Sequence, residues 1–122
     1  MTVVPRRRPF LIAVGVLLVV AGLAVRFGIP GALGDRLGGI AYTALVYVVV
    51  AFAAPRMARL RVGSIALAWS VAVEVLQLTS LPADLAAAFG PSRLVFGTSF
   101  AWPDLVAALV GAAAATLVDR HR

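Results

Sequence analysis

Residues 10–25 read FLIAVGVLLVVAGLAV, an apolar run that contains no charged side chain. The run follows arginines at positions 6–8 and ends at Arg26. Because a helix rises about 1.5 Å per residue and the hydrocarbon core of a bilayer is roughly 30 Å thick, a run near this length crosses most of it. The stretch therefore predicts a transmembrane helix over about residues 10–27, with arginines marking both of its ends.

The same segment has features of a secretory signal sequence, since Gly22-Leu23-Ala24 resembles a small-x-small cleavage site. The apolar run nevertheless continues to a spanning length, and Arg26 fits poorly directly after a cut. We therefore expect the first helix to be retained.

Three further apolar runs follow, at about residues 37–54, 62–81 and 100–118, each near the length of a membrane span. Helices are the economical choice for all four, because a lone strand leaves its backbone unsatisfied in lipid. The sequence thus predicts an all-α, polytopic membrane protein, a four-transmembrane-helix bundle forming a single domain over residues 1–122. The glycine-rich residues 31–39 are expected to form a flexible outer loop, and residues 82–97 a segment in the outer interface.

The composition excludes several functional classes. Of the 122 residues, 62% are hydrophobic and 13% are charged, and the mean hydropathy is +1.02, which does not fit a water-soluble domain. A sequence without cysteine has no disulfide framework, thiolate metal site or cysteine nucleophile. The single histidine, His121, is the penultimate residue, far from the acids of the spans, which excludes a Ser-His-Asp triad and a histidine metal site. No cofactor or metal ion is expected.

The basic residues predict an orientation. The net charge is +6, and all eleven basic residues are arginine. With both termini in the cytoplasm, eight of the eleven lie inside, as the positive-inside rule favours: Arg6, Arg7, Arg8, Arg56, Arg59, Arg61, Arg120 and Arg122. Arginine without lysine, with abundant alanine, valine and glycine, indicates a GC-rich bacterial genome, so the expected location is the bacterial cytoplasmic (inner) membrane. Orientation and membrane lipids account for the inner charge, and no nucleic-acid partner is expected.

Polar side chains converge toward the outer end of the predicted bundle. Glu74 lies about 18 Å beyond Val62 along the helix axis, and Gln77 is one turn further. Small and polar residues recur every three or four positions and so share one helix face: Gly63, Ala66, Ser70, Glu74 and Gln77, then Asp104, Ala108, Gly111 and Ala115. Such faces pack inward in lipid. The candidate ligand-binding residues are Arg26, Tyr42, Glu74, Gln77, Arg93 and Asp104.

Three functions are compatible with this convergence, in which Arg26 is the expected partner of Glu74 or Asp104. The first is a binding protein for a lipid headgroup, a cell-wall precursor or another amphiphile. The second is a small proton-coupled transporter, weakened because no polar path is evident on the inner side of Ser70. The third is a structural or assembly protein whose polar network only locks the bundle. A paired-carboxylate enzyme is less favoured, because nearby arginines would keep both acids ionised.

Aromatic residues complete the predicted arrangement. Trp69 faces away from Glu74 and is expected to meet lipid, and Trp102 is expected to be an interfacial anchor. Tyr47 lies near mid-membrane on a face with Thr43 and Ala51, so its hydroxyl needs an internal partner.

Several short motifs resemble a known family. The chain is similar to an uncharacterised family of small bacterial integral membrane proteins, catalogued as a domain of unknown function, over nearly its whole length. The motifs are AGLAVRF (21–27), PG (30–31), LGD (33–35), Tyr42 with ALVY (44–47), EVLQL (74–78), RLVFG (93–97), FAWPDL (100–105) and Gly111. The resemblance singles out Arg26, Glu74, Gln77, Arg93, Trp102 and Asp104. Members often carry an L-D-x-x-R motif in the outer loop, where this sequence has Asp84-Leu85-Ala86-Ala87-Ala88 without the arginine.

More distantly, Glu74-x-x-Gln77, an arginine and Asp104 at the start of a glycine-containing last helix resemble the VanZ superfamily, named for a teicoplanin-resistance protein. Neither resemblance implies an established mechanism. The small family is sometimes given a ribosomal-maturation label, which nothing in this sequence supports.

Overall fold

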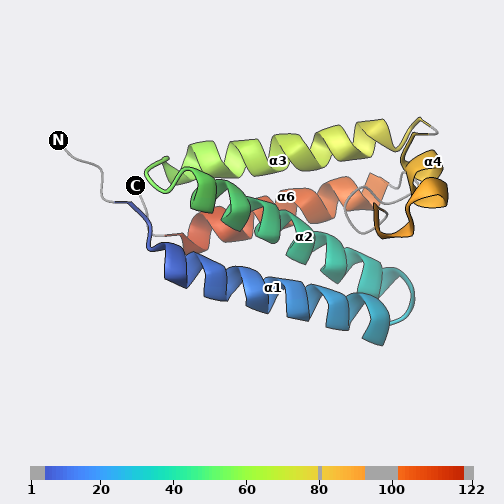
Figure 1. Cartoon of the computed structure of the whole chain (residues 1–122), viewed down its shortest axis with the longest axis horizontal. Helices are drawn as coiled ribbons and strands as arrows, with labels where there is room; N and C mark the ends of the chain where they lie inside the picture. The colour runs from blue at the N-terminus through green and yellow to red at the C-terminus, as the bar shows by residue number, and fades with distance from the viewer. Residues whose placement is uncertain (1–4, 80, 93–101, 120–122) are drawn as a thin grey trace.

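The computed structural model describes residues 5–79, 81–92 and 102–119, and all regular structure within these ranges is helical. The helices are α1 (Arg8–Gly28), α2 (Gly31–Ala53), α3 (Arg59–Leu76), α4 (Leu81–Ala88), the 3-10 helix η1 (Gly90–Ser92) and α6 (Trp102–Val118). Figure 1 shows α1, α2, α3 and α6 running side by side, with α4 beyond the end of α3. The predicted all-helical fold is confirmed.

Helix α2 is central, because it packs against α1, α3 and α6, while α3 also packs against α6. The predicted inward face of α3 is buried from Gly63 to Glu74, and Gln77 is half-buried. On α6, Ala108 and Gly111 are buried, and Asp104 is half-buried. The interior of the bundle is therefore built mostly from small and polar side chains.

Two glycines allow α6 to approach its neighbours closely. A Cβ atom on Gly111 would lie 2.7 Å from the carbonyl oxygen of Ile40 on α2. A Cβ atom on Gly63 of α3 would overlap the hydroxyl oxygen of Thr116 on α6. Two backbones therefore meet at Gly111, whereas at Gly63 the Thr116 side chain packs against the α3 backbone. Small residues allow such close approach between helices that associate in lipid.

Large apolar side chains point away from this interior. The α1 helix has a hydropathy of 2.6 with 6% of its span buried, and residues Leu33–Ala53 of α2 have a hydropathy of 1.7 with 17% buried. Among the described residues, these two helices are long and apolar enough to cross a membrane. A soluble protein rarely leaves such apolar surface exposed, so both helices favour a membrane environment. The α3 helix carries Arg59, Arg61 and Glu74, and α6 has 17 residues, so neither is identified as a span by composition.

The start of α2 corrects one expectation. Residues 31–39 are the first turns of a helix, so the predicted flexible loop is wrong. Ile29 and Pro30 alone turn the chain, and Gly31 follows with φ +74°, which a larger residue rarely adopts. A Cβ atom on Gly34 would overlap the Ile29 carbonyl. The glycines that indicated a loop serve instead to make a tight turn.

The end of α3 also differs from the predicted boundary at residue 81. The helix ends at Leu76, and the Thr79 hydroxyl donates a hydrogen bond to the Leu76 carbonyl at 2.6 Å. The same hydroxyl accepts a hydrogen bond from the Leu81 amide at 3.3 Å. The local bonds of this threonine close α3 and lead into α4, because they compete with the continuing helix ladder.

Candidate functional site

The structure brings Glu74, Gln77 and Asp104 to the same end of the bundle. Glu74 lies in the last turn of α3 and is 8% exposed, and Gln77 caps that helix. Asp104 lies in the first turn of α6, which packs against α3. Figure 1 shows the end of α3 and the start of α6 together, next to α4. We call this region the α4 end.

An ion pair at the α4 end joins α2 to α6. The Arg36 Nη1 atom donates to Asp104 Oδ1 at 3.2 Å. The two side chains are 34% and 28% exposed, so the pair is accessible from outside the bundle. Sequence reasoning did not select Arg36. It lies seven residues before Thr43 and eleven before Tyr47, so in α2 it shares their helix face. Because residues 31–39 were predicted to form a loop, the helical spacing was not applied to Arg36.

Arg26 does not occupy its expected position. It lies in the last turn of α1, is exposed, and forms no ion pair with any acid in the part of the chain that the structure describes. Its expected pairing with Glu74 or Asp104 is therefore wrong. The physical reason is that α1 packs mainly against α2, whereas Asp104 belongs to α6.

Tyr42 lies deeper than its predicted place near the outer end of the second helix. Because α2 begins at Gly31, Tyr42 lies about 16 Å from its start. Its hydroxyl accepts a hydrogen bond from Trp69 Nε1 at 2.9 Å. Trp69 is 44% exposed, as a lipid-facing side chain would be, but it also links α3 to α2. The Tyr42 hydroxyl keeps its own proton for donation.

A second pair of hydroxyl groups joins the same two helices in the interior. The Thr43 Oγ1 and Ser70 Oγ atoms are 3.1 Å apart, and the two residues are 1% and 4% exposed. Ser70 lies one turn from Glu74 on α3, and Thr43 lies one turn from Tyr47 on α2.

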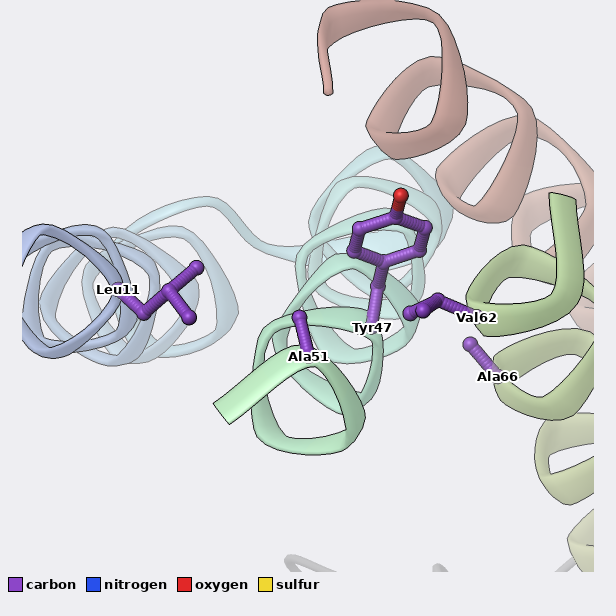
Figure 2. Close-up of a cluster of buried hydrophobic side chains, with 5 residues drawn as sticks. All are labelled: Leu11, Tyr47, Ala51, Val62 and Ala66. Atoms are coloured by element: carbon purple, nitrogen blue, oxygen red, sulfur yellow. The ribbon is translucent and has the colours of Figure 1, made fainter. Parts of the chain in front are cut away.

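Tyr47 belongs to a polar cluster at the opposite end, which we call the terminal cluster: Arg6, Tyr47 and Asp119. Arg6 Nε and Nη2 lie 2.9 and 2.7 Å from Asp119 Oδ2, and the Tyr47 hydroxyl donates to the same oxygen. Arg6 Nη1 also donates to the Met57 carbonyl at 2.7 Å. Figure 2 shows the Tyr47 ring beside Val62, with its hydroxyl directed toward α6. The cluster thus joins the start of α1, the α2–α3 connection and the end of α6.

The terminal cluster was not predicted, although its signal is present in the sequence. An even number of spans returns the last helix to the side of the first, so Arg6 and Asp119 are natural partners. The cluster also corrects the expectation of an empty inner half, because Tyr47 carries polar atoms past Ser70 toward Asp119. The described residues include no group of three His, Asp or Glu side chains able to hold a metal ion.

Comparison with protein families gives a result for most of the chain. Residues 29–112 match the family described as "Protein of unknown function (DUF2809)". The chain belongs to this family. Comparisons with the curated proteins and with the solved structures find no match.

The DUF2809 region contains the α4 end and, of the terminal cluster, Tyr47 alone. Arg36, Tyr42, Glu74, Gln77 and Asp104 lie within the matched residues, whereas Arg26, Arg6 and Asp119 lie outside them. Two predictions fall where the structure gives no description: Arg93 lies outside the described residues, and the side chain of Trp102 is not described.

Proposed function

We propose that this DUF2809 protein is a multi-pass membrane protein that binds the polar head of an amphiphile at the α4 end. The observation that carries the proposal is the half-exposed Arg36–Asp104 ion pair. A guanidinium has five N–H donors, and one of them makes the bond to Asp104, so the others can bind an anionic oxygen. The ligand class is a lipid headgroup, a cell-wall precursor or another amphiphile with a negative head.

Neighbouring groups support a polar headgroup site. Glu74 and Gln77 lie at the end of α3, beside the start of α6. Arg93, which lies outside the described residues, is a further cation proposed for the site from the sequence. Tyr42, with its hydroxyl proton available, lies deeper on α2. Within this proposal Asp104 orients Arg36, and Arg26 is a weaker candidate at the rim because it is exposed on α1.

The proposed topology has four spans, α1, α2, α3 and α6, with both termini in the cytoplasm of a bacterium and the α4 end outside. Its support is the positive end of the bundle, at the start of α1 and around the α2–α3 connection, which carries six arginines: Arg6, Arg7, Arg8, Arg56, Arg59 and Arg61. A distant relation to the VanZ superfamily is also proposed. Its support is the Glu74-x-x-Gln77 motif and the position of Asp104 at the start of α6.

Native mass spectrometry of the purified protein tests the binding proposal. We expect wild type to retain an amphiphile that Arg36→Gln and Asp104→Asn lose. Asp35→Asn is the matched control, because Asp35 is an exposed acid next to Arg36 without an ion pair to any described residue. Equal retention by all four proteins would refute the site. Loss of thermal stability without any bound amphiphile in wild type would favour the structural role.

Proton-coupled transport is the second candidate, favoured by the polar groups between the two ends. The Thr43–Ser70 bond lies between Glu74 and Tyr47, and Tyr47 reaches Asp119. The test is proton flux into liposomes containing the purified protein. Flux that Glu74→Gln abolishes and Asp84→Asn preserves would support transport, since Asp84 is an exposed acid on α4. Absence of flux in wild type would exclude it.

A further inference from the structure

An apolar groove of about 220 Å³ lies between α1 and α2. One wall is formed by Leu11, Ile12 and Gly15 of α1, and the other by Leu45, Val48, Val49 and Phe52 of α2. The groove opens outward, because Ile12 and Val49 on its walls are 54% and 58% exposed. It belongs to the two helices whose length and composition suit a membrane span, so the groove faces acyl chains when these helices span.

One end of the groove carries a fixed cation. The Arg8 guanidinium lies over the Phe52 ring, 5.3 Å from its centroid, and Arg8 Nε donates to the Phe52 carbonyl at 3.1 Å. Phe52 itself lines the groove. Two anchoring contacts therefore hold the arginine beside the groove, with its terminal nitrogens available to bind an anion.

The charge around Arg8 lacks a balancing acid. In the described ranges, Arg8 forms no ion pair, and Asp119 at the same end is bonded to Arg6 and Tyr47. Arg7 is exposed next to Arg8. An arginine at the end of an apolar groove matches a phosphate attached to an acyl chain, which is the chemistry of an anionic phospholipid.

We propose that the α1–α2 groove binds one acyl chain of an anionic phospholipid, and that Arg8 contacts its phosphate. The site lies at the end opposite the proposed amphiphile site and uses different residues. Loss of lipid binding at one site therefore leaves the proposal for the other site standing. It rests on α1 and α2 spanning the bilayer, which is part of the proposed topology. Lipid bound here would fill the groove and contact both α1 and α2.

Native mass spectrometry with added lipid tests this site. The protein is titrated in detergent with phosphatidylglycerol and, separately, with phosphatidylcholine. Arg8→Gln removes the phosphate contact, and Arg61→Gln is its control, because Arg61 is an exposed arginine of α3 at the same end. Gly15→Leu fills the groove: a Cβ atom there would make ordinary contacts, 3.6 Å from Val48 and 3.9 Å from Leu45. Val16→Leu is its control, since Val16 is exposed on α1 outside the groove.

We expect wild type, Arg61→Gln and Val16→Leu to retain phosphatidylglycerol in preference to phosphatidylcholine. Arg8→Gln is expected to weaken phosphatidylglycerol binding about fivefold, which is the gain in affinity that one arginine contributes near an anionic headgroup. Gly15→Leu is expected to weaken the binding of both lipids. Equal losses in Arg8→Gln and Arg61→Gln would overturn the proposal, because they indicate diffuse attraction. A dimer that Gly15→Leu dissociates would also overturn it, because a second copy would then occupy the groove.

Discussion

At the scale of the residue, the hydroxyl groups of the two tyrosines of α2 make different hydrogen bonds in different surroundings. The Tyr47 hydroxyl donates to the Asp119 carboxylate, and the residue is 4% exposed. The Tyr42 hydroxyl accepts from Trp69, which is 44% exposed. A hydrogen bond to a charged group contributes more to the free energy of unfolding than one between neutral groups. Burial increases the cost of leaving a polar atom without its hydrogen-bond partner.

These surroundings predict unequal effects of removing the two hydroxyl groups. Tyr47→Phe is expected to lower the free energy of unfolding by about 2 kcal/mol, and Tyr42→Phe by less than about 1 kcal/mol. Thermal unfolding of both purified variants in one detergent measures the difference. Equal losses would show that the Tyr47–Asp119 bond contributes nothing beyond an exposed hydrogen bond.

Single residues also show what the sequence could predict. Helical phase correctly selected the interior positions of Ser70 and Glu74, because burial follows a fixed period along a helix. The partner of Asp104 could not be found in this way. Choosing Arg36 over Arg26 requires knowing that α6 packs against α2, which phase within one helix does not reveal.

At the scale of the element, close backbone contact fixes the position of α6 against α2. A Cβ atom at residue 111 would lie 2.7 Å from the carbonyl oxygen of Ile40, which is closer than real Cβ contacts allow. We expect Gly111→Ala to lower the free energy of unfolding by about 1–3 kcal/mol, because the backbones must separate. Gly28→Ala is the control, since a Cβ there has no neighbour within 4 Å. Unfolding in detergent measures both, and equal stability of the two variants would contradict the close approach.

The terminal cluster connects elements that are distant in the sequence. Arg6 bonds to Asp119 beyond α6 and to the Met57 carbonyl between α2 and α3. Arg6→Gln is therefore expected to lower the free energy of unfolding by about 1–3 kcal/mol, because it removes an ion pair to a largely buried carboxylate. Arg7→Gln is expected to change it little, since Arg7 is exposed. A double-mutant cycle with Asp119→Asn checks that the loss belongs to this pair, and additive effects would contradict it.

Boundaries of elements were harder to predict than their type. The apolar runs predicted that these segments are helical. Glycines such as Gly31 and Gly34 are common both in loops and in a tight turn that starts a helix, so they did not show where α2 begins. Likewise, the apolar run of the third helix continues past Leu76, and the break depends on the hydroxyl bonds of Thr79. Side-chain bonds of this kind are not visible in hydropathy.

At the scale of the whole molecule, small and polar groups lie inside while large apolar groups lie outside. This distribution explains why α1 can be almost entirely exposed in the structure yet belong to a stable bundle, provided that lipid surrounds it. The recurrence of small and polar residues every three or four positions predicted this pattern for the third and last helices. The proposed four-span topology requires the α4 end and the terminal cluster to lie on opposite sides of the membrane.

Labelling of single cysteines in intact cells tests that requirement most directly. The sequence has no cysteine, so each introduced thiol is the only reporter. Ala83 is exposed on α4, and Ala58 is exposed between α2 and α3. The account predicts that a membrane-impermeant maleimide labels Ala83→Cys in intact cells and Ala58→Cys only after lysis. Labelling of both in intact cells, or the reverse order, would contradict the four-span bundle with its α4 end outside.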